Sequence, residues 1–212
     1  MPHGHSHGAG NNCEHQSSDV DRALEKGIQY SLYQKIDLQN VECLNEETEG
    51  SAKFVFKPYE RRFDYEQFVQ SDDQRELLLN IPFTGNIKLK GIIIVGPDEG
   101  MCPDKVKLYK NRPGMTFGEA SGVYDQEIEL AYDPVGEVEY TPKAAVFSTV
   151  HHLSMYFPSN FGAENTKISY IGLRGEFTEV HDHGVTICNY ELRPNLTDHK
   201  NNLFDSMKHE IQ

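Results

Sequence analysis

Three histidines near the start of the chain alternate with small residues and have the spacing of a metal-binding tail. His3, His5 and His7 place three imidazole rings at i, i+2 and i+4 in a stretch rich in Gly and Ser. On a flexible chain such rings can gather around Ni²⁺, Cu²⁺ or Zn²⁺. Pro2 excludes an amino-terminal copper site built on deprotonated backbone amides, because proline has no amide proton to lose. We interpret the stretch as a solvated tail, with metal binding as the alternative.

A second pair, His181 and His183, has the spacing of two metal ligands on a strand. Residues at i and i+2 point to the same face, so both rings could bind one metal ion. The pair resembles the opening of the cupin metal motif, which next requires a Glu shortly after the second histidine. Ile187 and Cys188 occupy those positions. A polar turn between two strands is the favoured interpretation, and a cupin-like metal site is the alternative.

Two acidic clusters supply the candidate partner-binding residues. Glu46 and Glu47 form one cluster, and Asp72 and Asp73 form the other. Such clusters are commonly solvated loops, and as a binding feature they would suit a partner with a basic patch. The sequence leaves both interpretations open.

Motifs of nucleophilic catalysis and nucleotide binding are missing. The sequence contains no P-loop and no G-x-G-x-x-G, and no G-x-S-x-G elbow stands between a predicted strand and a helix. The four cysteines, Cys13, Cys43, Cys102 and Cys188, form no C-x-x-C pair, which excludes the thioredoxin-type redox motif. We expect reduced thiols in the cytosol or nucleus, and Cys188 is interpreted as a small core residue. We predict no catalytic residue and no cofactor.

The charge balance narrows the classes of partner. The 212 residues include 33 Asp and Glu against 20 Lys and Arg, which gives a formal net charge of −13. Neutralising phosphates requires clustered Lys and Arg, so we expect no direct nucleic-acid binding. The longest apolar run, at 91–96, is too short to cross a membrane, and no secretory signal is visible.

Strand-length runs dominate the middle of the chain and predict a mainly β fold. Turn residues separate the runs, including an expected turn at 84–86, and no long helix interrupts them. This pattern favours a sandwich or jelly roll with short helical turns, near 37–44 and 64–68. The predicted strands lie at 76–83, 87–96, 106–110, 127–131, 146–147, 150–157, 167–177 and 185–190. Alternation predicts that one of His151 and His152 is buried and hydrogen-bonded while the other is exposed.

Composition divides the chain into three segments. Residues 1–20 are predicted to form a flexible tail rich in His and Gly, and residues 194–212 a polar C-terminal tail. Residues 21–193 are predicted to form a single folded domain between these disordered termini, and we expect a monomer.

The strand segments together resemble the PITH domain, a family named for a proteasome-interacting domain of a thioredoxin-like protein. The matching residues lie at 36–46, 76–83, 87–90, 103–111, 115–117, 126–130, 146–153 and 165–176. The resemblance implies a jelly-roll β-sandwich of the galactose-binding-like type without catalytic residues. It also implies association with the regulatory particle of the 26S proteasome, in the cytoplasm and nucleus.

The sequence and the resemblance together predict a non-enzymatic protein-interaction module that acts as an adaptor or regulator of the proteasome. The alternative is a regulator of gene expression that acts through protein partners. Two further alternatives are a cupin-like metal-dependent enzyme using His181 and His183, and a glycan-binding jelly roll.

Overall fold

Short 3₁₀ helices precede and interrupt a set of antiparallel strands in residues 25–179, the part of the chain that the computed structural model describes. The elements are η1 (Ser31–Lys35), β1 (Glu42–Leu44), η2 (Ser51–Val55), η3 (Tyr59–Arg61), β2 (Val69–Gln70), β3 (Leu77–Val95), β4 (Lys105–Lys110), α2 (Phe117–Ala120), β5 (Gln126–Glu129), β6 (Val150–Phe157), β7 (Lys167–Ile168) and β8 (Tyr170–Thr178). The prediction of a mainly β fold is confirmed. No helix within this range is long and apolar enough to span a membrane. The predicted tails and the strand expected at 185–190 lie outside the described residues.

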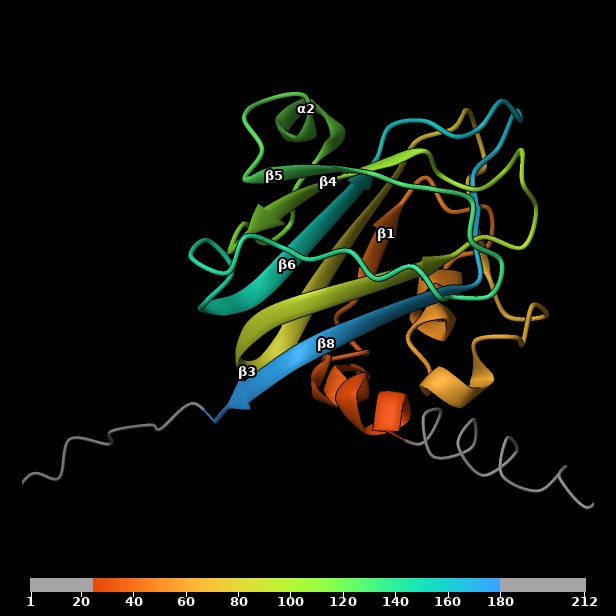
Figure 1. The fold of residues 1–212 in the computed structure, drawn as a ribbon. Helices are drawn as coiled ribbons and strands as arrows, with labels where there is room; N and C mark the ends of the chain where they lie inside the picture. Colours follow the sequence, from red (N-terminus) through yellow and green to blue (C-terminus); the bar gives the residue numbers. More distant parts are fainter. Residues whose placement is uncertain (1–24, 180–212) are drawn as a thin grey trace, which may run out of the picture. The chain divides into compact units, whose positions relative to one another are not determined.

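The long strand β3 connects two layers of sheet (Figure 1). Its first half pairs with β6, from Leu77 opposite Phe157 to Pro82 opposite His152, and β1 lies along its other edge. Its second half pairs with β8 as far as Val95. The remaining strands extend the first layer in the order β6-β4-β5, and β2 and β7 form a separate pair. The result is a sandwich in which one strand contributes to both sheets.

A β-bulge lets both halves of β3 face the same core. Leu79 and Ile81 point inward from the first half, and alternation keeps odd-numbered residues inward as far as Leu89. The register with β8 shifts between Leu89 and Gly91, after which the even-numbered Ile92 and Ile94 point inward. An extra residue reverses the alternation of side chains, so the bulge keeps the apolar set on the core side.

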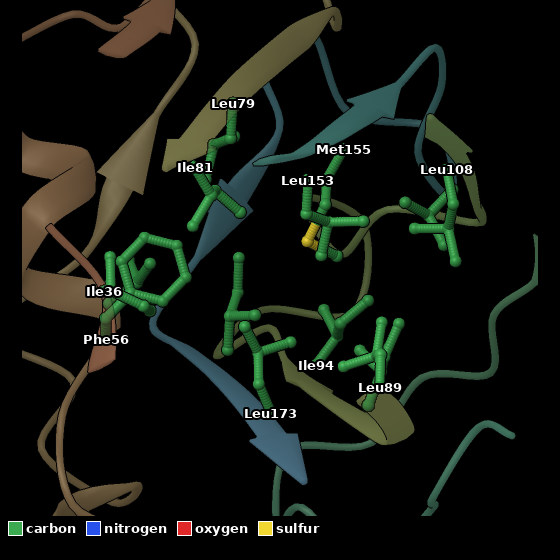
Figure 2. Packing of buried hydrophobic residues seen from close by; sticks show 14 of the residues in the cluster. Ile36, Phe56, Leu79, Ile81, Leu89, Ile94, Leu108, Leu153, Met155 and Leu173 are labelled. Carbon is green, nitrogen blue, oxygen red and sulfur yellow. The ribbon is translucent and has the colours of Figure 1, made fainter. Parts of the chain in front are cut away.

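The core lies between the two layers. Figure 2 shows Leu153 and Met155 of β6 across from Leu89 and Ile94 of β3, and all four side chains are fully buried or nearly so. Each such side chain contributes about 1.5–3 kcal/mol by leaving water. Phe56 closes one end of this core.

Tyrosines and a loop cover the outer faces of both layers. On the β8 side, Tyr30 and Tyr59 stack with ring centroids 5.7 Å apart, and Tyr59 meets Tyr170 edge to face at 6.4 Å. On the β6 side, Tyr109 and Tyr156 pack beneath the segment that contains α2. Both faces of the sheet are therefore buried in places, which explains the wholly apolar run at 91–96.

Two local predictions were wrong, and a third was right only in part. The residues 84–86 do not form a turn, because β3 continues through them. Residues 146–147 are part of a turn, although the Phe147 side chain is fully buried and its carbonyl accepts the Leu89 N–H at 3.0 Å. The segments 37–44 and 64–68 contain short turns, such as the one closed by the Asn40 N–H and the Asp37 carbonyl at 3.1 Å, but no helix. The 3₁₀ helices occur at η1, η2 and η3.

Candidate functional site

The two acidic clusters of the sequence lie next to each other at one end of the sandwich. The loop after β1 carries Glu46 and Glu47, and the loop after β2 carries Asp72 and Asp73. Glu46 forms an isolated antiparallel bridge with Ser71, which holds the two loops side by side. The fold thus joins two clusters that the sequence presents separately.

Asn45 holds the second loop in place. Its backbone has φ of 68°, a left-handed conformation that Asn tolerates better than most residues. Its side-chain Nδ2 donates to the carbonyls of Asp73 at 2.5 Å and Glu76 at 2.7 Å, and its Oδ1 accepts the Asp73 N–H at 3.1 Å. The Asn45 carbonyl accepts the Asp72 N–H at 2.9 Å. These bonds fix the position of the acidic side chains that follow.

The adjacent glutamates Glu46 and Glu47 have different roles. One oxygen of the Glu46 carboxylate accepts the Gly50 N–H at 2.6 Å. The other accepts the Ser51 hydroxyl at 3.0 Å and the Ala52 N–H at 2.9 Å. Glu46 therefore organises the start of η2, while Glu47 is exposed to solvent.

A first hollow of about 600 Å³ opens beside the second loop. Its charged lining comprises Asp72, Asp73, Glu76, Glu164 and Arg75. The Glu76 carboxylate accepts a hydrogen bond of 2.7 Å from the Tyr156 hydroxyl. Burial, together with this bond to Glu76, raises the pKa of Tyr156 well above its ordinary value, so the phenol remains a neutral donor. The hollow has a strong excess of negative charge.

A second hollow of about 270 Å³ is lined by residues of the loop after β1, of η2 and of the segment that leads into β2, and we call it the aromatic hollow. Phe54 and Phe68 line it, and Glu47, Glu66 and Gln70 also contribute. The Phe54 side chain is 54% exposed, a large exposure for a phenylalanine that lies beside carboxylates.

The local sequence explains why Phe54 stays outside the core. In η2, Ala52 and Val55 are one 3₁₀ turn apart and both are buried, so Phe54 points away from them. Three consecutive apolar residues, 54–56, cannot all face inward from such a short helix. Burial of Val55 and Phe56 thereby leaves Phe54 in the hollow.

Two lysines contact the segment that carries Phe68 into the aromatic hollow. The buried Lys57 ammonium donates to the carbonyls of Asp64 at 2.5 Å and Gln67 at 3.2 Å, which holds the segment before β2. Burial lowers the pKa of Lys57. The Lys167 ammonium lies 4.0 Å from the centre of the Phe68 ring. Such cation–π contacts stabilise an aromatic side chain by about 0.5–1 kcal/mol at exposed sites.

All of the predicted metal ligands lie outside the described part of the chain. His3, His5, His7, His181 and His183 lie outside residues 25–179, so the structure does not place them. Within residues 25–179, no group of three or more His, Cys, Asp or Glu is arranged to hold a metal ion.

The adjacent histidines of β6 follow the expected alternation. His152 is buried and His151 is exposed, as the strand pattern predicts. The Nδ1 atom of His152 has no hydrogen-bond partner, contrary to the prediction for the buried ring. Burial, with a smaller contribution from His151, lowers the pKa of His152. The ring is thus held neutral in the folded protein.

The two described cysteines are separate thiols. Cys102 is buried, and Cys43 is partly buried. Burial raises the pKa of Cys102 to about 11 and that of Cys43 further still. Neither environment favours a reactive thiolate. Cys13 and Cys188 lie outside the described residues.

Solved structures support the fold class. The CBM32-1 and CBM32-2 domains of Clostridium perfringens ZmpB in complex with GalNAc align with a TM-score of 0.51 at 9% identity, covering 76% of this chain and 39% of that one. At this identity the likeness concerns the fold alone. The described part of the chain is therefore a jelly-roll β-sandwich of the galactose-binding-like type, as predicted.

Within this class the chain belongs to the PITH domain family, whose model matches residues 22–194. It is 65% identical over 212 residues to PITH domain-containing protein GA19395 of Drosophila pseudoobscura pseudoobscura, covering 100% of both chains. It is 51% identical over 200 residues to PITH domain-containing protein 1 of Homo sapiens, covering 94% of each. Family membership indicates a protein-interaction module, and the names of these relatives mention no enzymatic activity.

Sequence reasoning missed several residues of the two hollows. Phe54, Phe68, Glu66 and Glu164 are not among the predicted site residues, because none of them belongs to an acidic cluster or to a recognised motif. The apolar triplet 54–56 is the one signal that could have indicated an outward-facing phenylalanine.

Proposed function

We propose that this protein is a non-enzymatic interaction module that associates with the regulatory particle of the 26S proteasome. The observation that carries the proposal is the match to the PITH family over residues 22–194, since resemblance to that family implies this association. The proposal extends to the role of adaptor or regulator, and to the cytoplasm and nucleus as its location.

The loop end of the sandwich supports an interaction role. Loops held on a rigid β scaffold are the usual place for recognition residues. Here one hollow opens beside the loop after β1 and the other beside the loop after β2, and their lining includes Glu47 of the first predicted cluster and Asp72 and Asp73 of the second. An excess of exposed carboxylates fits a partner surface that presents Lys and Arg, because complementary charge speeds association and selects the partner.

Binding to purified particles tests the proposal. The full-length chain is mixed with 26S proteasome or with 20S core particle, and each mixture is separated by size-exclusion chromatography. We expect the chain to elute with the 26S particle and not with the core particle, since the proposed site lies on the regulatory particle. Absence of co-elution at micromolar protein and low salt would refute the proteasome association.

A further inference from the structure

We propose that the aromatic hollow is a docking site for one large apolar side chain of a partner protein, flanked in the partner by Lys or Arg. The inference rests on the proposed function as an interaction module and specifies the chemistry of the partner segment. It assigns Phe54 and Phe68 to the apolar contact, and Glu47 and Glu66 to the flanking cations.

The size of the hollow suits one large side chain. Its volume is about 270 Å³. Phe54, which is 54% exposed, and Phe68 both line it. Interface hot spots have this form, in which an aromatic anchor is enclosed by contacts that exclude water.

Contacts within the chain hold both aromatic parts of the lining in place before a partner binds. Glu46 fixes the start of η2 through bonds to Gly50, Ser51 and Ala52. The Lys57 ammonium holds the segment that leads to Phe68. A preformed site loses little conformational entropy on binding, so a small contact area can still give measurable affinity.

The carboxylates that line the hollow specify the residues that flank the docked side chain in the partner. Glu47 and Glu66 are exposed, and neither takes part in an ion pair among residues 25–179. The Lys167 ammonium, which contacts the Phe68 ring, lies 3.7 Å from the carboxylate of Asp98, so its charge is already matched. The lining of the hollow therefore combines two aromatic side chains with two exposed carboxylates, the complement of an apolar side chain between basic residues.

A peptide experiment tests this chemistry without the proteasome. The probe is a short fluorescein-labelled peptide with a central Leu between pairs of Lys, measured by fluorescence anisotropy against the full-length chain. Two comparison peptides replace the Leu by Ala or the Lys by Glu. We expect saturable binding of the first peptide and at least about tenfold weaker binding of the others. No binding of the first peptide at about 1 mM, or equal binding of all three, would overturn the proposal.

Paired variants locate the contact. Phe54→Ala should weaken peptide binding at least about tenfold, while Phe63→Ala should change it less than about twofold. Phe63 is a matched control because it is 47% exposed and lies outside the hollow. Glu66→Gln should weaken binding and reduce its salt dependence, whereas Glu129→Gln on β5 should not. Equal effects of Phe54→Ala and Phe63→Ala, together with an unchanged Glu66→Gln, would refute the site. Thermal melting confirms that each variant is folded.

The same variants in the 26S co-elution assay separate the two proposals. If the unmodified chain fails to co-elute, the proteasome association is refuted and the peptide result alone decides the docking site. If the unmodified chain co-elutes and Phe54→Ala does so equally well, the hollow is not the proteasome contact and the inference fails. Loss of co-elution with Phe54→Ala, but not with Phe63→Ala, supports both the proteasome association and the docking site.

Discussion

Replacing Glu46 by Ala should destabilise the protein far more than the same change at its neighbour Glu47. The Glu46 carboxylate accepts three hydrogen bonds, from the Gly50 N–H, the Ser51 hydroxyl and the Ala52 N–H. A hydrogen bond to a charged group contributes about 1.5–3 kcal/mol. The site is only partly buried and the three bonds share one side chain, so we expect a total loss of about 2–3 kcal/mol. Glu46→Gln keeps an acceptor oxygen and should lose about 1 kcal/mol.

Urea denaturation followed by circular dichroism measures these differences. The midpoint should fall in the order Glu47→Ala, Glu46→Gln, Glu46→Ala, with an unchanged dependence on urea concentration. Glu47 is exposed, and its variant should lie within about 0.5 kcal/mol of the unmodified chain. The melting temperature of Glu46→Ala should fall by about 5–10 °C for a chain of this size. A loss at Glu46 no larger than at Glu47 would refute the assignment of Glu46 to the start of η2.

Three further predictions concern the interior. His152 is buried with a lowered pKa, so the unfolded state binds more protons, and stability should fall as pH drops below about 6.5; His152→Leu should flatten that dependence in urea titrations at different pH. Gly175→Ala should destabilise the folded protein by more than about 2 kcal/mol in thermal melts, because an added Cβ would lie 2.1 Å from the Lys88 carbonyl oxygen. A variant as stable as the unmodified chain would contradict the geometry of the bulge. Cys102 has a pKa raised to about 11, so mass spectrometry should find it unmodified by iodoacetamide in the native protein and modified in urea; rapid native labelling would contradict its burial.

The sequence predicts most strands because their alternation is a local property. The runs at 106–110 and 150–157 coincide closely with β4 and β6, since β4 alternates over most of its length and β6 is an almost wholly buried run. The turn predicted at 84–86 was wrong because of a contact with a residue distant in sequence. A Cβ on Gly85 would lie 2.8 Å from the Phe177 ring, so glycine there allows β8 to approach closely and does not mark a turn. Phe177 is distant in sequence, and no local pattern reveals that contact.

The candidate site was only half predictable for a related reason. Adjacent acidic residues are apparent in the sequence itself, so the pairs 46–47 and 72–73 can be predicted as candidate binding residues. Their proximity depends on the bridge between Glu46 and Ser71 and on the bonds of Asn45, which are products of the tertiary fold. The exposure of Phe54 depends on the competition of three adjacent apolar residues for one buried face. Such competition is resolved by packing, and propensity alone does not rank the residues.

The shared strand β3 should make the two layers of the sandwich open together. Its backbone amides bond to β1 and β6 along one half and to β8 along the other, so separating either layer removes partners from the same continuous segment. In amide hydrogen exchange we therefore expect both halves of β3 to report the same opening free energy, equal to that of global unfolding. Pairing of Leu77 with Phe157 also joins residues far apart in sequence, which places folding in the millisecond-to-second range typical of β-sandwiches. In this protein, cooperativity between the layers is a property of one strand.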